Sequence, residues 1–282
     1  MLTDYHVHLR PDERAATPEA FFTEERIRLY LDAAEAAGIA ELGISEHIYR
    51  FRQALTVWDH PFWREWAEDD LDDYCAFLGA SPVRCGIEAD FVPGREAELE
   101  ALLDPRSFDY VIGSVHFLGE RSIDTEEFSI WEDGTEPDEV WRRYFETLAE
   151  AARSGLFDII AHPDLVKVWG RAGHLPSVDP RHFYEPAVEA IAGAGLAVEV
   201  STAGLRKQVK EIYPAPDFLE LCVAARIPIS LSSDAHQPDQ VGYRYDLAIE
   251  QLGRAGVEEI AVFEDRQRSS VPLGVETGAG CQ

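Results

Sequence analysis

The sequence predicts an α/β fold built as a parallel barrel, and three observations support this prediction. The chain has 282 residues, a length that fits one large α/β barrel. Short apolar segments alternate with helical stretches, which is typical of parallel strands buried on both faces. Histidines and acids follow the ends of these segments, and such side chains can converge only if the strand ends meet, as they do on one face of a barrel.

Eight short apolar segments are expected to form strands. They span residues 2–8, 40–45, 83–88, 109–115, 158–161, 197–201, 228–232 and 259–263. Helices are expected between them, where apolar residues recur every three or four positions. The clearest helices span residues 24–37, 137–154, 184–192 and 245–255. A glycine follows each of these helices and can end it: Gly38, Gly155, Gly193 and Gly256.

Two polar stretches interrupt this alternation. Residues 50–73 hold three tryptophans and are expected to form an insertion on the ligand side of the barrel. Residues 119–138 are a candidate lid. No linker rich in Pro, Gly or Ser divides the chain, so we expect one domain over residues 1–270 and a flexible tail over residues 271–282.

The composition argues against nucleic acid and membrane as partners. The chain has 25 basic and 53 acidic residues and a net charge of -28, whereas nucleic-acid binding depends on Lys and Arg that neutralise phosphates. No apolar run approaches the ~20 residues needed to cross a bilayer. The four cysteines form no CxxC pair, and the first strand leaves no room for a signal peptide. A reduced, cytoplasmic setting is therefore expected.

Six histidines and two acids follow the predicted strands and form a candidate metal site. They are His6, His8, His47, Glu88, His116, His162, Asp234 and His236. His6 and His8 lie two residues apart on a strand and share a face, and a carboxylate at Glu88, which ends a buried strand, needs a cation. Each residue alone has a structural alternative, such as a cap or a salt bridge. Together, these nitrogen and oxygen ligands favour two or three Zn, Fe or Mn ions.

Basic residues near the same strand ends are candidates for binding phosphate. Arg206 follows the strand at residues 197–201, and its planar guanidinium suits phosphate oxygens. Lys167 follows AHPDLV and could join it, although ordinary surface basicity explains either residue. The sequence lacks a GxSxG elbow, a Walker loop and a GxGxxG turn after a strand. Hydrolysis by metal-activated water requires none of these motifs.

Taken together, six short motifs resemble the motif series of the polymerase and histidinol phosphatase (PHP) family: DYHVH, SEH, IEADF, GSVHF, AHPD and SSDAH. The resemblance runs from Tyr5 to about Tyr243. The stretches EVSTAGLRKQVKEIYPAPDFLELC and SLSSDAHQPDQVG are closest to the stand-alone histidinol-phosphate phosphatases. The resemblance implies a distorted (β/α)7 barrel with a trinuclear metal site at the carboxyl ends of the strands. One of the eight expected strands would then be irregular or peripheral.

The resemblance also implies roles for individual residues. A first metal would be held by His6, His8, Glu88 and Asp234, and a second by His47 and His236. Glu88 would bridge to a third metal, which His116 and His162 would also hold. Asp234 and His236, with Arg206, would then serve catalysis.

One feature of the family pattern is missing. The family usually has a further His or Asp ligand several residues after the HxH pair, where this chain reaches Arg14. Asp12 or Glu13 is expected to replace this ligand, and Glu13 is the one that we predict to bind metal. Arg206 matches the arginine that grips phosphate, and Lys167 falls where a second basic residue is expected.

The function implied is the hydrolysis of L-histidinol phosphate to L-histidinol and phosphate, a step of histidine biosynthesis. The first alternative is a metallophosphatase of the same family that acts on a phosphotyrosyl protein or a nucleotide. A metal-dependent amidohydrolase is another, although that class commonly uses a carboxylated lysine at a strand end, and no lysine ends a predicted strand here. The third alternative is a non-enzymatic module like the domains attached to polymerases. Such a module would be expected to lose the ligand residues, whereas this chain retains them.

Overall fold

Seven short parallel strands form the centre of the molecule, in the order β1-β2-β3-β4-β7-β8-β9. The computed structural model describes residues 1–11 and 21–274. The strands span Thr3–Asp4, Glu41–Ile44, Arg84–Asp90, Tyr110–Ser114, Ile159–Ile160, Ala197–Ser201 and Ile229–Ser232. A parallel bridge between Val7 and Ala235 joins the segments that follow β1 and β9, so the sheet nearly closes. The predicted distorted (β/α)7 barrel is confirmed.

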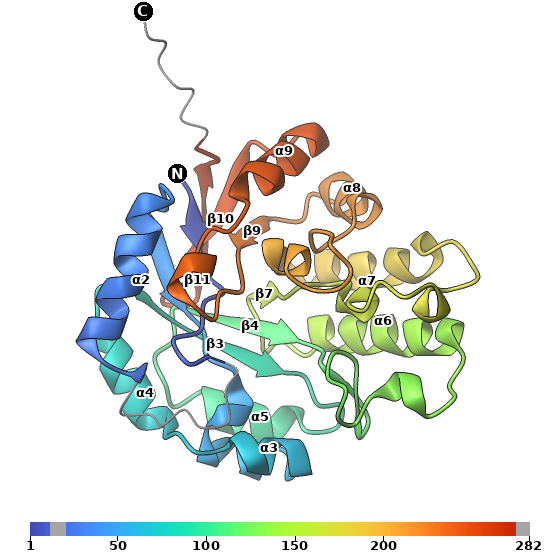
Figure 1. Cartoon of the computed structure of the whole chain (residues 1–282), viewed down its shortest axis with the longest axis horizontal. Coiled ribbons are helices and arrows are strands. Elements are labelled where there is room, and N and C mark those ends of the chain that lie inside the picture. The colour runs from blue at the N-terminus through green and yellow to red at the C-terminus, as the bar shows by residue number, and fades with distance from the viewer. Residues whose placement is uncertain (12–20, 275–282) are drawn as a thin grey trace, which may run out of the picture.

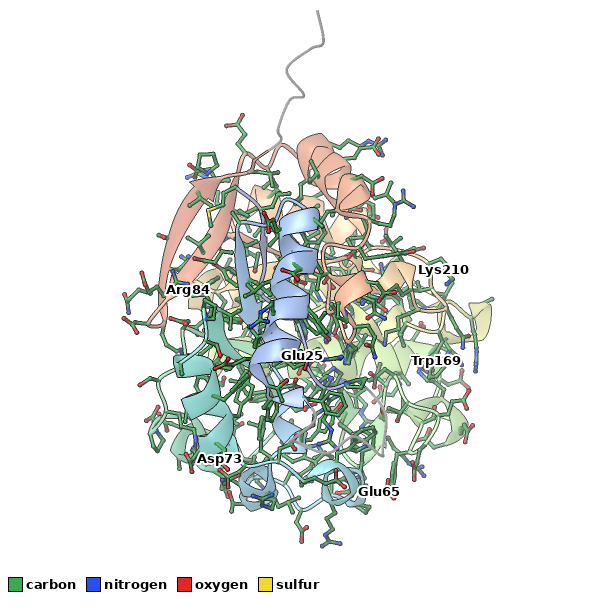
Figure 2. The ribbon with its side chains drawn as sticks, turned by 60° about the vertical axis from the view of Figure 1, so that its left-hand side comes forward. Glu25, Glu65, Asp73, Arg84, Trp169 and Lys210 are labelled. Carbon is green, nitrogen blue, oxygen red and sulfur yellow. The ribbon has the colours of Figure 1, made fainter. Side chains whose placement is uncertain are left out.

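Helices surround these strands (Figure 1). They are α2 Glu24–Ala36, α3 Pro61–Trp66, α4 Leu71–Gly79, α5 Glu96–Leu103, α6 Pro137–Arg153, α7 Arg181–Ala194, α8 Pro216–Ala224 and α9 Tyr245–Ala255. Acidic side chains such as Glu25 on α2, Glu65 on α3 and Asp73 on α4 lie on the outer surface (Figure 2). None of the described helices combines the length and the apolarity that crossing a membrane requires.

The helix ends follow the capping residues in the sequence, with one correction. The Thr23 hydroxyl caps α2 by accepting a hydrogen bond from the Arg26 amide. Helix α7 was expected to end before Gly193, but it continues to Ala194. Gly195 ends it with a left-handed φ of 71°, since the second glycine of the Ala-Gly-Ala-Gly run takes the conformation that favours glycine.

The eighth expected strand lies outside the barrel. Strand β10 (Glu259–Glu264) pairs antiparallel with β11 (Gln267–Pro272). The buried face of this hairpin, with Ala261 and Phe263, packs on Tyr5 and Tyr110. Residues 271 and 272 therefore belong to the hairpin and not to the expected tail, of which residues 275–282 lie outside the described residues.

Tight packing holds strands β2, β3 and β4 together. The Tyr110 ring on β4 lies over Gly43 on β2 and Gly86 on β3, and a methyl group at either glycine would overlap it. The Tyr110 hydroxyl donates to the Tyr5 carbonyl oxygen at 2.7 Å. One aromatic side chain thus fills the space above two glycines.

The insertion predicted after the second strand forms a compact unit of short helices. It runs through residues 48–70 and includes α3 and two 3-10 helices, Ile48–Arg50 and Arg52–Thr56. Two buried arginines connect it to the segment after β1. Arg10 pairs with Asp69 at 2.8 Å, and Arg50 Nη1 donates to the Arg10 carbonyl oxygen at 2.6 Å and pairs with Glu46 at 2.9 Å.

Candidate metal centre

The eight predicted ligand residues converge at the carboxyl ends of the barrel strands. Four sets of three side chains each bring one possible ligand atom within 4.8 Å of the others. The sets are His8, His47 and His236; His6, His8 and Asp234; His6, Glu88 and His162; and His47, Glu88 and His116. Because the sets share members, they form one continuous cluster. Such a cluster can hold more than one ion.

Glu88 lies at the centre of the cluster. Its Oε2 atom lies 2.5 Å from His47 Nδ1 and 3.2 Å from His6 Nε2. Its Oε1 atom lies 3.2 Å from His162 Nε2 and 3.4 Å from His116 Nε2. The two oxygens therefore face different histidines, which is the geometry that a carboxylate bridging two metals requires.

Asp234 and His236 complete the other side of the cluster. Asp234 Oδ1 lies 3.3 Å from His8 Nε2 and 3.8 Å from His6 Nε2. The His8 ring stacks on the rings of His47 and His236, with centroids 4.2 Å from each, and the centroids of those two rings lie 5.6 Å apart. Asp234 thus faces the two histidines after β1, while His236 lies beside His8 and His47.

The chemistry of the donor atoms fits metal ions. His6 Nε2, His8 Nε2, Glu88 Oε2 and Asp234 Oδ1 are buried and have no hydrogen-bond partner among the described residues. A buried polar atom without a partner is costly, so such atoms need an explanation. A bound cation supplies one, since these are imidazole nitrogens and carboxylate oxygens directed at a common space.

Buried carboxylates orient the histidines from behind. Glu199 on β8 lies 2.8 Å from His6 Nδ1 and accepts from the His162 amide at 2.7 Å. Asp90 lies 2.7 Å from His116 Nδ1. Such partners fix the ring so that Nε2 faces a metal. Glu199 is not among the site residues predicted from the sequence, although it is the one acid in the strand segment 197–201, which was a usable signal.

Glu46 serves the loop that carries His8. Its Oε1 atom accepts from the amides of Leu9 at 2.6 Å and Arg10 at 2.9 Å, and its Oε2 atom lies 3.7 Å from His8 Nδ1. Burial raises the pKa of Glu46, but Arg50 and His8 lower it to about 2. It is therefore a permanent negative charge behind the site.

The carboxylates control protonation of the metal-free site. Burial lowers the pKa of His6, but Glu199, Glu88 and Asp234 raise it well above its ordinary value. For His116, Asp90 and Glu88 outweigh burial and raise the pKa to about 10. By contrast, burial lowers the pKa of His47 to about 3. Burial raises the pKa of Glu88, yet the surrounding histidines outweigh burial and lower this pKa well below the usual range.

A cavity of about 210 Å³ opens beside the cluster. Its polar side includes His47, His116, His162, Asp234 and His236. We call Tyr49, Phe62, Trp66 and Phe117 the aromatic wall. The first three belong to the observed insertion of residues 48–70, and Phe62 and Trp66 lie within its predicted bounds. Asp124 and Thr125, from the predicted lid, and Lys207 also line the cavity.

The two basic residues predicted to bind phosphate, Lys167 and Arg206, both make contacts within the protein. Lys167 is buried, and its ammonium group pairs with Asp164 at 2.9 Å and Glu211 at 3.1 Å. It is not among the described residues that line the cavity, so the structure gives no support to the phosphate contact predicted for it. Arg206 donates from Nη2 to the carbonyl oxygens of Ser233 and Asp234. Lys207 faces the cavity instead.

The ligand expected in the loop after His8 lies outside the described residues, as both Asp12 and Glu13 do. Arg10, just before them, is buried and pairs with Glu68 and Asp69. The described part of this loop is therefore fixed by the insertion.

Comparison with known proteins indicates the family to which the chain belongs. The family model described as "PHP domain" matches residues 20–203. A Deinococcus radiodurans protein named "Probable histidinol-phosphatase" is 39% identical over 264 residues, which cover 90% of this chain and 94% of the relative. The Bacillus subtilis "Histidinol-phosphatase" is 28% identical over 197 residues, covering 62% of this chain and 70% of the relative.

A solved structure shares the fold. The crystal structure of histidinol phosphate phosphatase from Lactococcus lactis, complexed with Zn, L-histidinol and phosphate, has a TM-score of 0.73 at 20% identity. The match covers 95% of this chain and 98% of that one. The extent of the family match and the identity to the Deinococcus protein agree with the motif series in the sequence: the chain belongs to the PHP domain family.

Proposed function

We propose that the protein is a metal-dependent phosphomonoesterase that hydrolyses L-histidinol phosphate to L-histidinol and phosphate. The observation that carries this proposal is the convergence of histidines and acids from the strand ends on one cavity. The names of the relatives support the substrate, and the strongest support comes from the Deinococcus protein, which is similar over 94% of its length.

The proposed metal ligands are those that the sequence indicates. They are His6, His8, His47, Glu88, His116, His162, Asp234 and His236, with Glu13 as a further candidate outside the described residues. Two or three divalent ions, Zn, Fe or Mn, would polarise the phosphoryl oxygens and lower the pKa of water when bound there. Zn is the metal in the Lactococcus protein.

The cavity residues are proposed to bind the rest of the substrate. Lys207 supplies a positive charge for the phosphate group beside the cluster. The aromatic wall offers flat apolar surfaces to an imidazole ring, and the Asp124 carboxylate offers a negative charge to an ammonium group. Asp234 and His236 would orient the phosphoryl group through the ions that they would hold.

A small phosphate ester as substrate, rather than nucleic acid, and a cytoplasmic location belong to the same proposal. The net charge of -28 supports the first part. The cysteines of the described residues, Cys75, Cys85 and Cys222, are free, which supports a reducing compartment.

The test is phosphate release from a panel of esters, with metal content measured on the same sample. L-histidinol phosphate should exceed phosphotyrosine, nucleoside monophosphates and p-nitrophenyl phosphate in kcat/KM. A chelator should abolish the activity and divalent metal should restore it. Equal turnover of all esters would contradict the substrate assignment, and chelator-resistant turnover would contradict metal dependence.

A further inference from the structure

The turn that carries two proposed metal ligands has a strained backbone. It follows β9 and places Asp234 at a φ of 51°, in the left-handed region that side chains with a Cβ disfavour. Residues keep such a conformation only where their surroundings determine it. Contacts that fix this turn therefore bear directly on the position of the Asp234 carboxylate.

Arg206 supplies one of these contacts. Its Nη2 atom donates to the Ser233 carbonyl oxygen at 2.8 Å and to the Asp234 carbonyl oxygen at 2.7 Å. Its Nη1 atom is buried, with no hydrogen-bond partner among the described residues. The guanidinium carbon lies 5.5 Å from the Tyr243 ring centroid. Nη2 is thus committed to the backbone of the turn, and Nη1 is covered by protein.

Asp4 holds the turn from the opposite side. This buried carboxylate accepts from the Ser233 amide at 2.9 Å, the Ser233 hydroxyl at 2.5 Å and the Gly242 amide at 3.2 Å. The next residue of the turn, Ala235, exchanges backbone hydrogen bonds with His6 and His8. Two charged side chains of opposite sign therefore hold Ser233, one at its carbonyl group and one at its amide and hydroxyl.

We propose that Arg206 is a positioning residue of the metal centre: together with Asp4 it fixes the Ser233–Asp234 turn, so that Asp234 and His236 are placed before metal or substrate binds. The positioning role of Arg206 does not depend on the proposed function.

The first experiment uses metal-free protein and needs no substrate. Hydrogen exchange is compared in Arg206→Ala, Arg206→Lys, Asp4→Asn and wild type, over peptides that cover residues 229–243. Exchange of the Ser233 and Ala235 amides should be faster in Arg206→Ala and in Asp4→Asn. Arg206→Lys, which cannot present the same planar donor, should fall between Arg206→Ala and wild type. Arg64→Ala removes a surface arginine paired with Asp59 and should match wild type.

The second experiment titrates Zn²⁺ or Mn²⁺ into the same proteins. Loss of a group that orients a ligand weakens metal affinity by roughly 10- to 100-fold, and this range is expected for Arg206→Ala. Asp4→Asn should act in the same direction. Lys207→Ala should bind metal like wild type but should weaken inhibition by inorganic phosphate when saturated with metal.

One result would overturn the proposal: Arg206→Ala with wild-type exchange and metal affinity, but with phosphate inhibition weakened instead. If Arg206→Ala fails to fold, Arg206→Lys and Asp4→Asn carry the test, and wild-type exchange and metal affinity in both would overturn it equally. Exchange and metal titration are read without turnover. A failure of the histidinol phosphate assay would therefore leave this test intact.

Discussion

At the scale of single residues, Glu88 is the side chain that connects the two sides of the candidate metal cluster. Its two oxygens lie within 3.7 Å of ring nitrogens of five histidines, and the side chain is fully buried. A carboxamide has nearly the same shape but no charge. It could neither bridge two cations nor balance the imidazoles around it.

Glu88→Gln should therefore lose metal and activity together. We expect less than one ion per chain to remain tightly bound, and a fall in kcat/KM beyond the roughly 100-fold typical of a group that only orients a ligand. Elemental analysis and phosphate release on one preparation would check this. Glu98→Gln, a change at a half-exposed position on α5, is the control. Full metal content in Glu88→Gln would refute the bridging role.

Metal binding should release protons at neutral pH. In the metal-free protein the carboxylates raise the pKa of His116 to about 10 and that of His6 well above its ordinary value, and a raised pKa favours the protonated ring at pH 7. His47, with a pKa of about 3, is already neutral. Since a metal binds the neutral imidazole, it must displace the protons of His6 and His116, and metal affinity should rise with pH across the neutral range.

Calorimetric titration in two buffers with different ionisation enthalpies measures these protons. The apparent heat should differ between the buffers at pH 7, and His116→Gln should release fewer protons than wild type. Identical heats in both buffers would contradict the protonated state assigned to these rings.

At the scale of elements, the insertion of residues 48–70 depends on buried charges. Arg10 is buried beside Asp69 at 2.8 Å, while Glu68 on its other side is half-exposed. Burial raises the pKa of Asp69 to about 6, since Arg10 offsets only part of the cost. Three aromatic-wall residues belong to this unit, so the ion pair couples the cavity wall to the loop that carries His8.

Arg10→Met should destabilise the protein by about 3–5 kcal/mol, because it leaves a buried carboxylate without its main partner. Urea denaturation of the metal-free protein would measure this change in the free energy of unfolding. Arg64→Met breaks a solvent-exposed pair in the same insertion and should change stability little. If both variants unfold at the same urea concentration, the buried pair does not anchor the insertion.

The elements also show what could be read from the sequence. The ligands were predictable because each follows its strand within a few residues, and a parallel barrel brings such positions together. The hairpin of β10 and β11 was not predictable. The apolar run at residues 259–263 gives no information about the direction of the strand that pairs with it, and β11 is polar and largely exposed. The ion pairs of Lys167 could not be predicted from the sequence, because one partner, Asp164, lies three residues before it and the other, Glu211, comes from a distant loop.

At the scale of the whole molecule, we expect metal binding to stabilise the barrel. The candidate ligands come from the segments after β1, β2, β4, β7 and β9 and from β3 itself, so ions bound there would connect strands that are far apart in the chain. Ions that bind only the folded state stabilise it by mass action, by about 2.7 kcal/mol at 100 times Kd.

Removing the metal should lower the melting temperature by roughly 5–10 °C, as expected when that contribution is lost from a domain of this size. Differential scanning calorimetry with and without a chelator would measure the shift, and added Zn²⁺ should reverse it. Glu88→Gln should show a much smaller shift. A melting temperature that does not respond to the chelator would mean that the ions do not stabilise the barrel.

The contact of Tyr110 with Gly43 and Gly86 has a consequence for how this barrel can change over evolutionary time. Positions 43, 86 and 110 should therefore change together, because either glycine can gain a side chain only after the ring at position 110 has become smaller. In an alignment of relatives, larger residues at positions 43 and 86 should occur only in lineages that have lost the aromatic residue at position 110. The order of the substitutions is therefore constrained: the ring must be lost first.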